Sequence, residues 1–199
     1  MKRMIKISIA MVIVFVLFSS FYSISNGDES YMNTNIEVDP NIEYHFDLVE
    51  NPESIYDLID MSPIILEISN KNSKVDTVDV NGVNFIYSNI KIETVLKDQT
   101  KNLKKTDSIP LLEYGFDDKS KDKFLLPQNK THIVFLKKIK DPKFGYAYRT
   151  VGLYYGKFTK DDSKSIDGGN FINDMIMIDK KNISINKNRL NKIINSKSK

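Results

Sequence analysis

The stretch from Phe85 to Lys97, FIYSNIKIETVLK, constrains the fold more than any other part of the 199-residue chain. Its even-numbered positions are mostly apolar, and its odd-numbered positions include an asparagine, a lysine and a glutamate. Because side chains alternate between the two faces of a β-strand, one face would meet a core and the other would meet water. At about 3.3 Å per residue the stretch would span roughly 40 Å, which predicts a long, curved central strand.

Four further stretches have the β-branched and aromatic composition of strands. They cover residues 64–68, 108–114, 131–139 and 145–158. Residues 70–79 are expected to be an exposed loop or hairpin, because Asn81-Gly82 is a strong two-residue turn signal. A weaker alternation at 171–178 indicates a small extra strand. The five main strands predict a mainly β fold with minor α content: a small antiparallel OB-like barrel, closed or nearly closed.

Two short helices are expected to flank this barrel. Residues 51–61 offer Asn51 as the N-cap and Pro52 at the first helical position, and their apolar side chains recur at helical spacing. Pro63 should end this helix. Residues 186–195 show the same apolar spacing with a basic exposed face, which predicts a short C-terminal helix.

The first 25 residues have the features of an export signal. Three basic residues within the first six precede an apolar run at 7–18, and Ser23 and Ser25 offer small residues before a cleavage point. A membrane span needs about 20 apolar residues, which favours a cleaved signal over an anchor. If the segment is not cleaved, residues 7–24 are the expected membrane contact. Either alternative places the rest of the chain outside the cell or at its surface.

These features divide the chain into four segments. They are a signal peptide or anchor at 1–25, a flexible acidic lead-in at 26–50, an OB-like domain at 51–182 and a basic amphipathic helix or tail at 183–199.

The basic excess of the whole chain comes from the expected signal. Beyond residue 25 there are 26 basic and 26 acidic residues, so the composition gives no reason to expect a nucleic-acid partner. The charges are unevenly divided, with a balance of −11 in residues 26–100 and +11 in residues 101–199. Either the two halves interleave their charges, or a basic face binds an anionic surface polymer or an acidic protein.

Most familiar chemistries are excluded by the residues present. The chain has no cysteine, which excludes disulfides, thiolate catalysis and a lipoprotein anchor. It contains no GxSxG elbow, phosphate-binding loop or dinucleotide fingerprint. The two histidines, His45 and His132, lack the spacing of a metal site, and the aspartates at 161–167 lack that of an EF-hand. No cofactor and no metal are therefore expected.

A resemblance to a family supports the fold. The succession DLIDMSPIILEIS, YSNIKIETVLKD, LLPQNKTHIVFLKK and YRTVGLYYGKF resembles a loose group of secreted bacterial OB-like barrel proteins, over about residues 51–160. The layout is also distantly similar to netrin- and TIMP-like modules, without the cysteines that define them. The chain departs from the bacterial pattern at Glu67 and at Lys97-Asp98. The resemblance implies the barrel fold and no shared catalytic residues.

One stretch combines aromatic and basic residues in the way that ligand-binding OB faces do. The candidate ligand-binding residues are Lys137, Lys138, Tyr146, Tyr148, Arg149 and Tyr154, with Lys140 and Lys143 nearby. The alternative interpretation is that the tyrosines pack in the barrel wall and the lysines protect strand edges.

Three functions remain open from the sequence. The favoured one is a non-enzymatic binding or interaction module, secreted or at the cell surface. The second is an extracellular hydrolase that uses His132 with an acidic partner. The third is a structural subunit of an envelope or spore-associated assembly.

Overall fold

The computed structural model describes residues 32–38, 50–71, 75–80, 83–115, 125–141, 143–153, 155–163, 169–178 and 180–197. The chain divides into two units, residues 1–34 and 35–199, and every strand and helix named below belongs to the second. The expected signal, His45 and the Asn81-Gly82 turn lie outside the described residues. Within the described part of the chain, no helix has the length and apolar character needed to cross a membrane.

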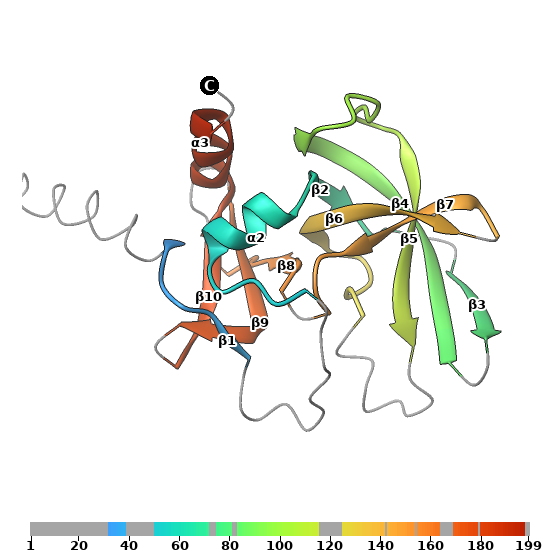
Figure 1. Cartoon of the computed structure of the whole chain (residues 1–199), viewed down its shortest axis with the longest axis horizontal. Helices are drawn as coiled ribbons and strands as arrows, with labels where there is room; N and C mark the ends of the chain where they lie inside the picture. Colours follow the sequence, from blue (N-terminus) through green and yellow to red (C-terminus); the bar gives the residue numbers. More distant parts are fainter. Residues whose placement is uncertain are drawn as a thin grey trace, which may run out of the picture. The chain divides into compact units, whose positions relative to one another are not determined.

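Five strands close into a barrel. They are β2 (Ile64–Ser69), β4 (Val83–Asp98), β5 (Ser108–Gly115), β6 (Thr131–Asp141) and β7 (Gly145–Thr150). The ring runs β2–β4–β5–β7–β6 and closes where β6 pairs with β2 (Figure 1). Four of the five pairings are antiparallel, and the β5–β7 pairing is parallel. The predicted five-stranded OB-like barrel is therefore confirmed, with one parallel pair in it.

Strand β4 is the long central strand that its alternation predicts. It pairs with β5 through residues 84–91 and with β2 through residues 91–98, so it bends from one side of the barrel to the other. Ser88, Ile90 and Ile92 point into the barrel and are buried. The opposite face is less exposed than the alternation suggests, because Tyr87 is buried against Leu112 and Ala147.

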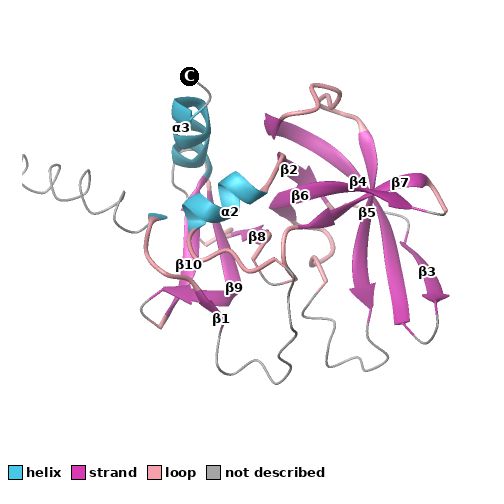
Figure 2. Cartoon of the chain, viewed as in Figure 1, coloured by secondary structure: helices cyan, strands magenta, loops and turns pink. Residues whose placement is uncertain are grey.

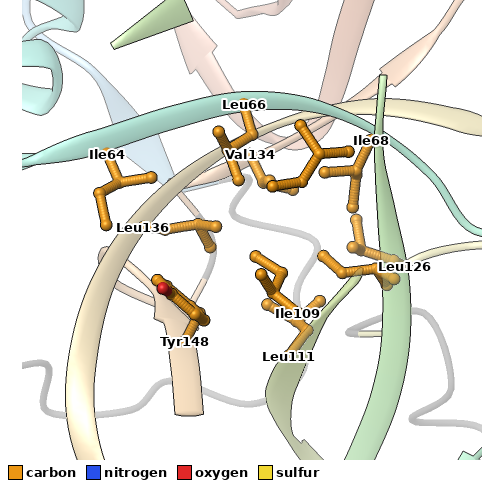
Figure 3. Close-up of a cluster of buried hydrophobic side chains, with 11 residues drawn as sticks. Ile64, Leu66, Ile68, Ile109, Leu111, Leu126, Val134, Leu136 and Tyr148 are labelled. Atoms are coloured by element: carbon orange, nitrogen blue, oxygen red, sulfur yellow. The ribbon is translucent and has the colours of Figure 1, made fainter. Parts of the chain in front are cut away.

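The barrel interior is a continuous apolar core to which every barrel strand contributes (Figure 3). Its members are Ile64, Leu66, Ile68, Ile90, Ile92, Ile109, Leu111, Leu126, Val134, Leu136 and Tyr148. Leu126 comes from the segment before β6 rather than from a strand, and its side chain packs into the same core (Figure 3). Leu103, from the loop between β4 and β5, packs against the same core. Side chains from all five barrel strands therefore meet in one apolar core.

Further strands extend the sheet beyond the barrel. Strand β3 (Val75–Val80) forms the expected hairpin with β4. On the other side, β8 (Lys157–Lys160) joins β6 to β9 (Asn170–Ile178), which also pairs with β1 (Glu37–Val38) and β10 (Lys181–Asn186). The extra strand near 171–178 was predicted, and β10 was not.

The prediction of one long strand over 145–158 is wrong, since the chain leaves the barrel between Thr150 and Lys157. Gly152 has a φ of +60°, in the left-handed region that favours glycine. At Gly156 an added Cβ would lie 2.9 Å from the Phe135 carbonyl oxygen. The two glycines therefore mark close approaches of the backbone in the turn that moves the chain from β7 to β8.

Both expected helices are present (Figure 2). Helix α2 (Ile55–Met61) begins later than predicted, because Ser54 rather than Asn51 is its N-cap. The Ser54 hydroxyl accepts from the Asp57 N–H and caps the helix, and the Asp57 carboxylate accepts from the N–H of Glu53, the residue before the cap. Helix α3 (Lys187–Lys197) ends the chain and buries Leu190 and Ile194.

Candidate functional site

Three of the predicted ligand-binding residues meet where β6 pairs with β7. Lys138 lies opposite Tyr148, and its ammonium is 3.9 Å from the centre of the Tyr146 ring. The rings of Tyr146 and Tyr148 meet edge to face at 5.8 Å. Tyr148 is 3% exposed and belongs to the barrel core, whereas Tyr146 is 43% exposed. Of the predicted tyrosines that the structure describes, only Tyr146 therefore offers its ring to a ligand.

Lys137 and Arg149 lie on the opposite face of the same two strands and bind Glu50. Arg149 donates to both carboxylate oxygens of Glu50 at 2.8 Å, and Lys137 donates at 2.8 Å. Burial of this carboxyl favours its neutral form, but these hydrogen bonds and one from the Gly152 N–H outweigh burial and lower the Glu50 pKa to about 2. The two cations therefore attach the start of the α2 segment to the barrel wall.

Tyr154, the remaining predicted residue, lies outside the described residues. Its neighbour Tyr155 is buried, and its hydroxyl donates to the Asn51 side chain. Asn51, the expected helix cap, thus holds the turn between β7 and β8 instead.

The turn between β6 and β7 is fixed by a buried carboxylate. Asp141 accepts from the backbone N–H groups of Lys143 and Phe144 at 2.9 Å each, and from the Tyr87 hydroxyl at 2.8 Å. Although burial opposes ionisation, these donors lower the Asp141 pKa below its usual value. Burial and the nearby Asp141 carboxylate raise the pKa of Tyr87 to about 12. The ionised Asp141 therefore holds the backbone of Lys143 and Phe144 just before β7.

An exposed aromatic ring lies on this turn. Phe144 is 44% exposed, and its ring centre lies 5.1 Å from that of Tyr87. The Lys143 ammonium is 5.5 Å from both ring centres and forms an ion pair with Asp76 of β3. The Tyr146 ring, in contrast, packs on Tyr148 of the barrel core, so the two exposed rings lie at the tip of one hairpin on different supports. We call the residues of this tip, Lys138, Lys140, Lys143, Phe144 and Tyr146, together the hairpin surface.

The hairpin surface is basic, apart from the exposed Asp76 carboxylate of β3 that pairs with Lys143. Residues 131–150 contain five lysines and arginines and one carboxylate, Asp141, which is buried. Lys138 and Lys140 are exposed and form no ion pair within the described part of the chain. Phe144, the most exposed large apolar residue described, was not among the predicted residues. It lies outside the alternating strand pattern, so periodicity gave no signal for it.

A second group of polar residues lies at the end of the barrel where Leu126 enters the core. Lys157 of β8 forms a 2.7 Å ion pair with Glu113 of β5; the Glu113 side chain is buried, and the Lys157 side chain is mostly buried. Glu113 also accepts from the Leu126 N–H at 3.0 Å. Beside this cluster is a half-open groove of about 620 Å³, lined by residues 125–127, Lys130, Lys157, residues 159–163 and residues 172–175. The groove mixes lysines with aspartates, so it has no predominant charge.

His132 lies at the same end of the barrel, next to Pro127. Its Nδ1 lies 3.2 Å from the Thr159 hydroxyl and its Nε2 lies 3.0 Å from the Pro127 carbonyl oxygen. That carbonyl can only accept, so Nε2 carries the proton and Nδ1 accepts from Thr159. Burial lowers the His132 pKa to about 4. Neither ring nitrogen contacts a carboxylate among the described residues, and the ring is fully buried.

The His132 pKa predicts a loss of stability in mild acid. Since the folded pKa of about 4 lies below the ordinary 6.5, the unfolded chain takes up this proton first. The contribution is complete above pH 6.5 and is lost as the pH falls to 4, by about 3 kcal/mol. Urea unfolding at pH 7.5, 5.5 and 4 should show this loss relative to the His132→Gln variant. Parallel stability profiles for the two proteins would show that His132 is not held neutral.

No group of residues able to hold a metal ion occurs among the described residues. The comparisons with known proteins found no matching family model, no matching curated protein and no matching solved structure.

Proposed function

We propose that this protein is an exported, non-enzymatic binding module that engages an anionic partner at the cell surface through the hairpin surface. One observation carries the proposal. Phe144 and Tyr146, the two large apolar side chains that stand out as exposed in the described residues, lie two positions apart in one hairpin. A lysine ammonium lies near each ring.

The combination suits an anionic partner for a physical reason. Exposed rings supply apolar and stacking contacts, and adjacent ammonium groups supply attraction to negative charge. Because Asp141 is turned inward, no carboxylate of the hairpin opposes that attraction. Among the described residues, Asp76 pairs with Lys143, while Lys138 and Lys140 are exposed toward the proposed partner.

The environment of His132 supports a binding role over the hydrolase alternative. A general base must reach the proton that it removes from a substrate. Both ring nitrogens of His132 already have partners inside the protein, and burial, with a smaller effect of nearby Lys157 and Lys130, keeps the pKa of His132 low. Export is supported by the signal-like N-terminal sequence.

Charge reversal tests the proposal. We expect K138E/K140E to bind beads coated with poly(glycerol phosphate) at least about tenfold more weakly than the unmodified protein, since each lysine near an anionic surface contributes about 1 kcal/mol. The matched control is K181E/K192E, which changes the net charge equally at exposed positions on β10 and α3. Beads coated with neutral dextran should retain neither variant. Equal loss of binding in the two variants would show that net charge, not the hairpin surface, governs retention.

A further inference from the structure

We infer that the anionic partner is the surface of a lipid bilayer that contains anionic headgroups, and that the hairpin surface docks on it with Phe144 and Tyr146 entering the interfacial region. This inference rests on the proposed function and specifies its partner.

The shape of the hairpin surface is the first argument. Lys143, Phe144, Gly145 and Tyr146 are all exposed, and a Cβ built on Gly145 would meet no atom within 4 Å. The turn therefore projects rather than lining a groove. The end of β6 and the start of β7 extend past the crossing of β4 and β5 toward β3 (Figure 1). A projecting turn fits a broad surface, and neither of the two grooves found among the described residues is lined by a residue of the hairpin surface.

The apolar part of the hairpin surface suits the interfacial layer. Phe144 has no polar atom to satisfy in water, and Tyr146 combines an apolar ring with a hydroxyl. Aromatic side chains collect where headgroups meet acyl chains. The Phe144 ring packs against the Tyr87 ring, and the Phe144 N–H donates to the Asp141 carboxylate. The exposed ring is therefore held in place before a bilayer is met.

The three lysines of the hairpin surface lie beside these rings. The Lys138 ammonium lies over the Tyr146 ring, Lys140 lies opposite Tyr146 on the paired strand, and Lys143 is beside Phe144. Lysine stems can lie along apolar surface while the ammonium reaches a headgroup phosphate. Such attraction requires anionic lipid and weakens within a Debye length, so binding should fall as salt rises.

A fluorescent reporter tests the inference, because the chain contains no tryptophan. In the full-length F144W variant the only tryptophan lies on the hairpin surface. With vesicles of phosphatidylglycerol and phosphatidylcholine in equal parts, we expect a blue shift of its emission and quenching by brominated acyl chains. With phosphatidylcholine alone we expect neither. Y146W is a second reporter, should F144W alter the packing on Tyr87.

Two controls locate the contact. N191W places the reporter at an exposed position of α3 and should show no quenching. F144W/K138E/K140E should lose the response on anionic vesicles. An uncleaved anchor at residues 7–24 would act on both kinds of vesicle and in F144W/K138E/K140E alike, so these two controls separate it from docking of the hairpin surface.

The outcomes separate this inference from the proposed function. If the protein binds poly(glycerol phosphate) through Lys138 and Lys140 but neither reporter is quenched, the bilayer inference is wrong and the proposed function stands. Equal quenching on both kinds of vesicle would also overturn the inference, because anionic headgroups would then play no part. If the hairpin surface binds neither polymer nor vesicles, both are wrong.

Discussion

Replacing Lys157 with methionine is expected to lower the free energy of unfolding at pH 7 by about 3–5 kcal/mol. The cause is that the Glu113 carboxylate loses its cationic partner. Glu113 is 3% exposed at its side chain, and Lys157 is its cationic partner, at 2.7 Å. Without the ammonium, the buried Glu113 carboxylate would keep, among the described residues, only the hydrogen bond from the Leu126 N–H. Chemical denaturation in urea measures the loss directly.

The double variant E113Q/K157M distinguishes a stranded charge from lost packing. A glutamine at 113 removes the charge and keeps an oxygen that can accept from the Leu126 N–H. We therefore expect the double variant to be more stable than K157M alone. If the stability losses of E113Q and K157M measured separately add up to the loss of the double variant, the two side chains are not coupled. The claim that Lys157 stabilises the Glu113 charge would then be wrong.

Replacing Glu50 with glutamine is expected to cost about 3 kcal/mol at neutral pH. The substitution preserves the side-chain volume but leaves Lys137 and Arg149 without their shared carboxylate. Both cations retain some access to water, which limits the loss. Thermal or urea unfolding of E50Q at pH 7 measures it.

The pH dependence gives this prediction its sign. Since the Glu50 pKa is lowered to about 2 in the fold, its contribution is complete above pH 4.5 and is lost as the pH falls toward 2. The difference between the unmodified protein and E50Q should shrink over the same range. D60N is the control, because it breaks the exposed Lys197–Asp60 pair and should cost less than about 1 kcal/mol. Equal losses in E50Q and D60N would contradict the assigned role of Glu50.

The barrel could be predicted from the sequence because its strands carry strong local patterns. The alternation in residues 85–97 and the apolar series in residues 131–139 depend on neighbouring positions only, and both became barrel strands. The departure of the chain after Thr150 was harder to foresee. It depends on the close approach of Gly156 to the backbone of Phe135, which belongs to another strand. Likewise, Asn51 and Ser54 both qualify as caps, and only the contacts of Asn51 with Tyr155 decide between them.

The candidate site could be predicted only in part. Alternation alone separates Lys137 and Arg149 from Lys138, Tyr146 and Tyr148, since odd and even positions face opposite ways. Lys137 and Arg149 bind Glu50, which lies 87 and 99 residues away in the sequence, so no pattern in the neighbouring sequence indicates this partner. Phe144 is exposed because a turn presents it, and that turn depends on the burial of Asp141 against Tyr87.

The most direct test of the central claim is an NMR titration of the ¹⁵N-labelled protein with soluble poly(glycerol phosphate). If the hairpin surface is the binding surface, the largest chemical-shift changes will fall on residues 138–146 and will weaken with added salt. Changes that centre on the groove near Lys130 and Asn173, or on α3, would contradict the claim and move the binding surface to that region.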